Sequence, residues 1–236
     1  MDKTAIRHAA TVIVLRDRQT DPKVLMGQRG AKAAFMPNKF VFPGGAVDAG
    51  DYDIPLMSPP RSICFDRLQF ETDPALIPAL YAAAIRELWE ETGLRAGISN
   101  SWSNAPLDWQ SYAATGLRPT AAPLSFVFRA ITPPGRPRRF DARFFLMDAV
   151  DLAGDPDDFS QASDELSHLQ WVPLRQAGGF DLPFITEVVL SEISKYARTG
   201  AQPETVPFFR NDDEEALFLQ LSGKGPLLQE NQKNNT

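Results

Sequence analysis

The chain has 236 residues, of which 43% are hydrophobic and 23% charged, and its net charge at pH 7 is −6. This composition is typical of a globular protein with a sizeable core, and the acidic balance argues against nucleic acid or an anionic membrane as a partner. The single cysteine excludes an internal disulfide and suits a reducing compartment. No targeting signal is recognisable, and the apolar run at residues 9–15 is too short to span a bilayer, so we expect a cytoplasmic protein.

Strand signals come first along the chain and are followed by one long helix. Apolar and β-branched runs predict strands at residues 10–16 and 23–29, and residues 39–45 are predicted to form a third short strand that runs into a Gly-Gly turn. Residues 52–73 are rich in turn formers and show no clear period. Residues 74–92 have a helical pattern, in which Asp73 can cap the start, Pro74 suits the first turn and Gly93 ends the helix.

The second half of the chain continues this mixture. Further strands are predicted at residues 123–131, 142–150, 166–174, 206–210 and 216–221. Helices are predicted at residues 106–116 and 183–198, and the polar end at about 223–236 is expected to be a flexible tail. No repeat or linker divides the chain, so we expect one α/β (α+β) domain over residues 1–236.

Three acidic residues share one side of the helix predicted at residues 74–92. At 100° per residue, Glu87, Glu90 and Glu91 fall within an arc of about 100°. Carboxylates this close repel one another unless solvent or a cation screens them, and pairing between Arg86 and Glu90 leaves two acids uncompensated. Mg²⁺ is a hard cation that carboxylates, waters and substrate phosphates bind. Taken alone, however, the helix fits an ordinary solvated acidic face better than a metal site.

An upstream glycine turn changes this interpretation. Gly45 is followed after five residues by Asp51, and residues 86–94 read "RELWEETGL". Together they resemble the signature of the Nudix hydrolase family: a glycine, five residues, an acid, seven residues, then R-E-U-x-E-E-x-G-U, where U is aliphatic. Aspartate replaces the usual glutamate at position 51. The second half fits at every specified position, although the 34 residues 52–85 stand where the pattern has seven.

The long gap is a feature of one branch of the family, the branch that contains the peroxisomal coenzyme A diphosphatase. Segments that resemble this branch are residues 35–51, 131–145 and 164–174. The resemblance therefore implies an insertion at about residues 52–78. We expect residues 52–72 to pack outside the metal site and to border the substrate cleft, with Asp51 and Arg86 close together.

The resemblance implies an α/β/α sandwich with a mixed central sheet and a metal-dependent enzyme. Glu87, Glu90 and Glu91 take the positions of ligands to Mg²⁺ or Mn²⁺, and Arg86 takes the position that pairs with the acid at 51. The implied reaction is hydrolysis of the diphosphate linkage in a nucleoside diphosphate derivative. The expected partner is therefore this small-molecule substrate, and a homodimer is left open. Glu165 lies in a loop that supplies an additional acid in many relatives, so it is our candidate general base, although a polar turn is an equal interpretation.

Substrate choice is indicated by a segment ahead of the glycine turn. Coenzyme A diphosphatases often carry L-L-(T/S)-x-R-(S/A)-x3-R-x3-G-x3-F-P-G-G, which this chain matches at Leu25 and Arg29 and replaces at Ala34 and Asn38. A basic turn at residues 132–139 could contact phosphate. The candidate substrate-binding residues are Arg29, Gly44, Gly45, Arg138 and Arg139.

Coenzyme A or an acyl-coenzyme A is therefore the predicted substrate. The alternatives are ADP-ribose, NADH or a dinucleoside polyphosphate, the last suggested by the position of Tyr112. An alternative of another class is a regulatory domain that binds a nucleotide without turnover.

Overall fold

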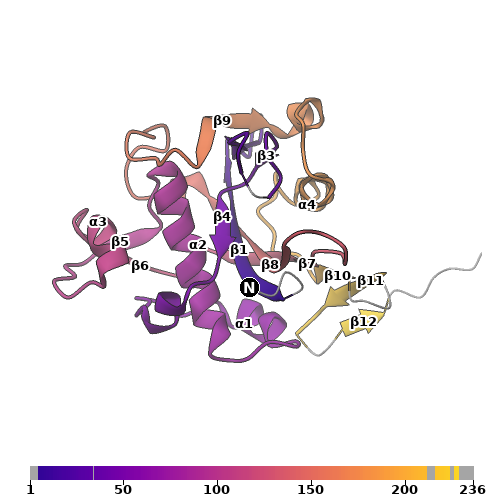
Figure 1. Cartoon of the computed structure of the whole chain (residues 1–236), viewed down its shortest axis with the longest axis horizontal. Helices are drawn as coiled ribbons and strands as arrows, with labels where there is room; N and C mark the ends of the chain where they lie inside the picture. The colour runs from indigo at the N-terminus through magenta and orange to yellow at the C-terminus, as the bar shows by residue number, and fades with distance from the viewer. Residues whose placement is uncertain (1–4, 34, 212–215, 224–225, 229–236) are drawn as a thin grey trace, which may run out of the picture.

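The computed structural model describes residues 5–33, 35–211, 216–223 and 226–228. A ten-stranded mixed sheet forms its centre, with strand order β12-β11-β10-β7-β8-β1-β2-β3; β4 pairs with β1 and β9 pairs with β2 (Figure 1). Its strands are β1 (Ile6–Arg16), β2 (Lys23–Arg29), β3 (Phe40–Val41), β4 (Gly44–Ala46), β7 (Ser125–Ile131), β8 (Arg139–Asp148), β9 (Leu166–Pro173), β10 (Val206–Asn211), β11 (Ala216–Leu221) and β12 (Pro226–Leu228). A separate antiparallel pair joins β5 (Gly97–Ser99) to β6 (Leu117–Pro119).

Helices cover both faces of the sheet. They are α1 (Ser62–Leu68), α2 (Leu76–Thr92), α3 (Gln110–Ala113) and α4 (Phe184–Ser194), joined by the 3₁₀ turns η1 (Ala49–Asp53), η2 (Leu107–Trp109), η3 (Ala149–Asp151) and η4 (Leu174–Gly179). Successive residues of β1 face opposite ways: Val12 and Val14 join the core under α1 and α2, whereas Ile13 and Leu15 join the core under α4. The predicted three-layer α/β arrangement is confirmed. None of the described helices is long and apolar enough to cross a membrane.

The long helix α2 begins and ends close to the predicted residues. The Asp73 carboxylate accepts a hydrogen bond of 2.9 Å from the Ala75 N–H in the turn just before the helix. Gly93 follows the helix in the left-handed conformation, with φ of 75°, and its N–H donates to the Trp89 carbonyl. These two local signals mark where α2 begins and ends.

Residues 39–45 differ from the prediction of one short strand that runs into a Gly-Gly turn, since both glycines lie in a strand. It forms two short strands with different partners, since β3 pairs with β2 and β4 pairs with β1. The chain crosses from one neighbour to the other at Pro43, which has no N–H to donate to a ladder. This crossing brings Gly44 and Gly45 beside the middle of the sheet.

The insertion is more ordered than its lack of periodicity indicated. It contains α1, whose Cys64 and Leu68 are buried, and the Cys64 Sγ accepts a hydrogen bond from the Phe126 N–H of β7. A helix of seven residues is too short to show a clear apolar period. The insertion therefore packs as part of the core layer that contains α2.

A buried charge network fixes the end of the insertion to the sheet. Arg129 donates to both oxygens of Asp141, at 2.9 and 2.7 Å, and to the Phe70 carbonyl at 2.7 Å. Arg143 pairs with Asp141 and donates to the Thr72 hydroxyl at 3.0 Å. Each buried charge has an opposite charge and further hydrogen bonds, as its removal from water requires.

The C-terminal segment is not wholly irregular. β12 pairs with β11 inside the stretch predicted to be a flexible tail. The other residues of that stretch, apart from Gly223, lie outside the described residues.

Candidate active site

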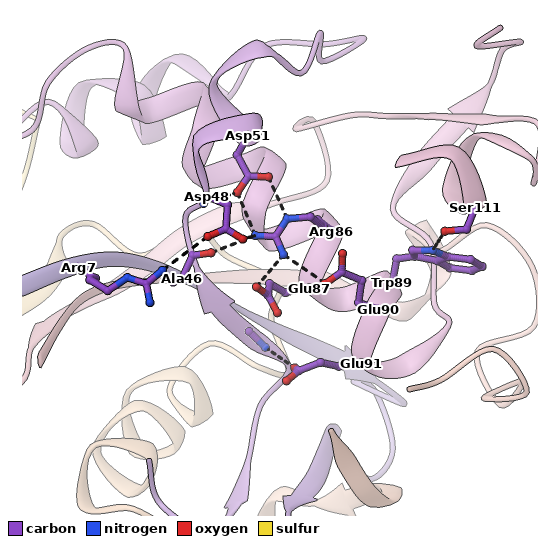
Figure 2. Close-up of polar contacts among 11 residues, drawn as sticks. Arg7, Ala46, Asp48, Asp51, Arg86, Glu87, Trp89, Glu90, Glu91 and Ser111 are labelled. Atoms are coloured by element: carbon purple, nitrogen blue, oxygen red, sulfur yellow. Dashed lines mark hydrogen bonds and ion pairs between the residues drawn. The ribbon is translucent and has the colours of Figure 1, made fainter. Parts of the chain in front are cut away.

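The two halves of the signature meet despite the insertion between them. Arg86 donates from Nε and Nη2 to the two carboxylate oxygens of Asp51, each at 3.0 Å (Figure 2). Asp51 also accepts from the Asp48 N–H at 2.9 Å, which closes the turn η1. The expectation that residues 51 and 86 lie close together is confirmed.

Arg86 has no donor left for a substrate. Its Nη2 also donates to the Ala46 carbonyl at 3.0 Å, and its Nη1 donates to Glu87 at 2.9 Å and to Glu90 at 3.2 Å. These contacts, with the two to Asp51, use all five N–H groups of the guanidinium. Arg86 therefore has a structural role, in which it positions Asp51, Glu87 and Glu90.

The acidic side of α2 faces inward. Glu91 is 1% exposed and accepts a hydrogen bond of 2.7 Å from the Gly44 N–H. Burial, helped by the charge of Glu87, raises the pKa of Glu91 to about 8. Burial likewise raises the pKa of Glu87 to about 7, against the lowering effect of Arg86, and raises the pKa of Glu90. Burial therefore outweighs the favourable effect of Arg86 on the ionised forms of Glu87 and Glu90.

The glycine turn makes room for these carboxylates. A Cβ at Gly45 would overlap the Glu87 carboxylate, and a Cβ at Gly44 would lie 2.5 Å from the Ala10 carbonyl oxygen. No side chain larger than glycine therefore fits at either position without a shift of its neighbours. Glycine at 45 lets the turn approach Glu87 of α2, and glycine at 44 lets it approach β1.

The oxygen atoms of Glu87, Glu90 and Glu91 are of the kind that binds a divalent cation, but the three side chains do not converge on one point. As the side chains stand, no three His, Cys, Asp or Glu residues among those described form a group able to hold a metal ion. Arg86 holds Glu87 and Glu90, while Glu91 turns to Gly44 (Figure 2). Carboxylate oxygens suit a hard cation, and a bound cation would favour the ionised forms of Glu87 and Glu91, which burial disfavours. Since the Glu90 side chain is 43% exposed, it has room to turn.

A cleft of about 1100 Å³ opens beside these carboxylates. Its lining includes Glu87, Glu90 and Glu165, which we call the acidic wall. The cations that line it in addition to Arg86 are Arg7, Arg29, Lys32, Lys39, Arg136 and Arg138. Aromatic side chains, among them Phe35, Phe140 and Phe184, cover other parts. The cleft can therefore hold a large molecule with both charged and apolar groups.

Most of the predicted substrate-binding residues line this cleft, but Arg139 does not. Arg29, Arg138, Gly44 and Gly45 are among the lining residues. Arg139 is 7% exposed and donates to the backbone carbonyls of Thr132 and Asn211, so its prediction as a substrate contact is wrong. Its side chain turns inward at the start of β8, where it satisfies carbonyls of the turn and of β10.

The insertion also lies elsewhere than predicted. It packs outside the acidic site as expected, but none of the described residues 52–72 lines the cleft. The buried charge network holds the end of the insertion on Arg129 and Arg143. Their neighbours along the strands, Ala130, Ala142 and Phe144, line the cleft, and neighbouring side chains of a strand face opposite sides of the sheet. The expectation that the insertion borders the substrate is therefore wrong.

One departure from the coenzyme A pattern has a structural reason. Asn38, which stands where that pattern has glycine, adopts the left-handed conformation with φ of 62°. Its N–H donates to the Arg29 carbonyl, and the Arg29 N–H donates to the Lys39 carbonyl, which closes the turn between β2 and β3. Asparagine tolerates this conformation better than other residues with a side chain, so the turn survives the replacement. Ala34, the other departure, lies outside the described residues.

Several cleft residues carry no recognisable sequence signal. Arg7, Lys32 and Phe184 enter the cleft through the pairing of distant elements. Conversely, Tyr112 is buried and donates its hydroxyl to the Ala96 carbonyl at 3.0 Å. This contact makes it a packing residue rather than a substrate contact.

Comparison with known proteins places this geometry in a family. No family model matches the chain. A Caenorhabditis elegans protein named "Putative nudix hydrolase 7" is 32% identical over 197 residues, which are 75% of this chain and 57% of that protein, so this chain spans little more than half of that relative. The crystal structure of a NUDIX hydrolase from Alicyclobacillus acidocaldarius is 26% identical, with a TM-score of 0.61, over 85% of this chain and 99% of that one. With these similarities and with both halves of the signature assembled in space, the chain belongs to the Nudix hydrolase family.

Proposed function

We propose that the chain is an enzyme that hydrolyses the diphosphate linkage of a nucleoside diphosphate derivative, with Mg²⁺ or Mn²⁺ held by Glu87, Glu90 and Glu91. The observation that carries this proposal is the pair of hydrogen bonds between Arg86 and Asp51, which joins both halves of the signature. Beside this pair, Glu87 and Glu90 line a cleft of about 1100 Å³, and Glu91 is buried behind them. A domain that had kept only the fold would have no need of this arrangement.

The residues of the chain divide the work of the reaction. A bound divalent cation would neutralise phosphate oxygens and lower the pKa of the attacking water. Arg86 keeps Glu87 and Glu90 on the side of the cleft, and the Gly44 N–H orients Glu91. Glu165 lines the same cleft as Glu87 and Glu90, and we propose it as the general base that accepts a proton from the attacking water.

We propose coenzyme A or an acyl-coenzyme A as the preferred substrate, cut to 3′,5′-ADP and a 4′-phosphopantetheine product. The cleft is at the upper end of the size of small-molecule sites, which suits so long a molecule. Arg29 lies in the cleft at its position in the coenzyme A pattern, and the left-handed Asn38 keeps the turn of that pattern. Arg136 and Arg138 also line the cleft and could meet the 3′-phosphate that distinguishes coenzyme A from ADP-ribose and NADH.

A panel of diphosphates with and without Mg²⁺ or Mn²⁺, with products identified by mass spectrometry, tests the reaction. We expect cleavage only with metal. Binding of several nucleotides without turnover would instead support a regulatory domain.

The same panel tests the substrate. We expect coenzyme A to be preferred over its dephospho form, and Arg138→Ala to reduce that preference about 10–100-fold, the effect of one charge-assisted contact. Arg175→Ala, in an exposed ion pair with Asp21 away from the cleft, is the matched control. Equal use of both forms by the wild-type chain would make ADP-ribose or NADH the leading candidate.

A further inference from the structure

Arg7 occupies a defined place next to the carboxylates of the site. It lies in β1, where its backbone pairs with Phe140 of β8. On the other side β1 pairs with β4, and the Val47 N–H donates to the His8 carbonyl at 2.9 Å. The two ladders fix the backbone at Arg7, so its side chain emerges beside the turn that carries Asp48 (Figure 2).

The guanidinium of Arg7 is available, in contrast to that of Arg86. Its one ion pair within the described part of the chain joins Nη2 to Asp48 Oδ1 at 3.6 Å, beyond normal hydrogen-bond length. The two side chains are 56% and 64% exposed, so solvent screens this pair and holds it weakly. Asp48 also lies 3.7 Å from the Arg86 Nη2, and therefore stands between a saturated arginine and one with free donors.

The acidic residues near Arg7 indicate that a cation is needed there to bind a diphosphate. A diphosphate that enters the cleft meets an acidic wall, which repels it unless cations compensate. A planar guanidinium can bind two phosphate oxygens at once, whereas Arg7 meets Asp48 through a single exposed contact of 3.6 Å. Lys39, another cation of the cleft, is already paired with Asp181.

We propose that Arg7 is a substrate-contacting residue that releases Asp48 and binds a phosphate group of the diphosphate at the edge of the acidic wall. This inference rests on the proposed function, because it assumes that a diphosphate is the ligand. It assigns a role to a residue outside the signature, at the start of the first strand.

A binding measurement that needs no turnover tests the inference. Methylenediphosphonate, a diphosphate with a P–C–P bridge that cannot be hydrolysed, is titrated by calorimetry into the full chain with Mg²⁺ present. We expect Arg7→Ala to weaken its binding about 10–100-fold, and Arg7→Lys to restore part of the loss, since a lysine keeps the charge but not the fork. Arg175→Ala, which removes an exposed ion pair outside the cleft, should bind as the wild type does.

Two further readouts separate the explanations. Mg²⁺ titrated without the diphosphonate should bind Arg7→Ala as it binds the wild type, because Arg7 contacts none of Glu87, Glu90 and Glu91. The kcat/KM of the best substrate should fall by the same factor as the affinity for the diphosphonate. Binding of the diphosphonate by Arg7→Ala within twofold of the wild type would overturn the inference. A wild-type chain that binds the diphosphonate but cleaves no substrate would overturn the proposed enzymatic function. The role of Arg7 would then be decided by the binding measurements alone.

Discussion

Asp51 and Arg86 are joined by two hydrogen bonds of 3.0 Å although the 34 residues 52–85 separate them in the chain. Both residues are buried, at 2% and 7% exposure. A buried ion pair of this kind adds little net stability but is costly to break from one side, since the remaining charge stays away from water.

Arg86→Met should therefore lower the free energy of unfolding by about 3–5 kcal/mol, because it leaves Asp51 buried and unpaired. Chemical denaturation at pH 7 measures this change. Arg175→Met, in the exposed pair with Asp21, should leave the free energy of unfolding nearly unchanged. Equal effects of the two substitutions would show that the buried pair has no special weight.

Glu91→Gln should abolish activity while the chain stays folded. The substitution preserves size and an oxygen that can accept from the Gly44 N–H, but it removes one charge from the proposed metal site. We expect turnover to fall at least about 100-fold, the upper end of the loss caused by outer-shell partners of a metal. Calorimetry with Mn²⁺ should show weaker binding as well. Near-wild-type turnover would exclude Glu91 as a metal ligand.

The metal-free protein should lose stability as the pH rises from about 4.5 to about 8. The pKa of Glu87 is raised to about 7 and that of Glu91 to about 8, from an ordinary value of 4.5. In this window the folded chain still holds protons that the unfolded chain has released, so a rising pH favours unfolding. Thermal melts in EDTA measure the effect.

Mg²⁺ should reverse this trend, because a cation binds the ionised carboxylates. Glu91→Gln should flatten the pH dependence of the melting temperature in EDTA, since it removes the group with the higher pKa. A melting temperature that is the same at pH 5 and pH 8 in EDTA would contradict the raised pKa values.

Gly45→Ala should reduce activity about 100-fold, because its Cβ would displace the Glu87 carboxylate and a shift of 1 Å in a catalytic group can have this effect. Gly178→Ala is the matched control, since a Cβ there meets nothing within 4 Å. Both variants should fold. Full activity of Gly45→Ala would show that Glu87 can move without loss of function.

The sequence predicts the strands and helices of this fold where the local pattern is strong. The termini of α2 follow from Asp73 and Gly93, whose effects depend only on neighbouring residues. The pairing of Arg86 with Asp51 could be predicted because the family signature specifies both residues. The division of residues 39–45 between two strands could not, because it depends on which neighbour each backbone group finds in the sheet.

Charged residues near the cleft show the limit of reasoning from sequence most clearly. Arg138 and Arg139 are adjacent in one basic turn, yet only Arg138 lines the cleft, while Arg139 is buried against backbone carbonyls. The alternation of side chains along a strand sends neighbours to opposite sides, and the phase of that alternation is set by tertiary packing. Arg7 was missed for the complementary reason, since its neighbours in space come from distant parts of the chain.

The position of the insertion has a consequence for how the protein can vary. By chain-entropy scaling, closing a loop of 34 residues instead of seven costs only about 1.4 kcal/mol more. The docking of α1 through Cys64 and Leu68 gives contacts that offset this cost. Because the two ends of the segment are held by Asp51 and by α2 itself, the length of the segment does not set the geometry of the acidic wall. Cys64, Leu68 and Thr72 are constrained instead by their own contacts with the core and the sheet.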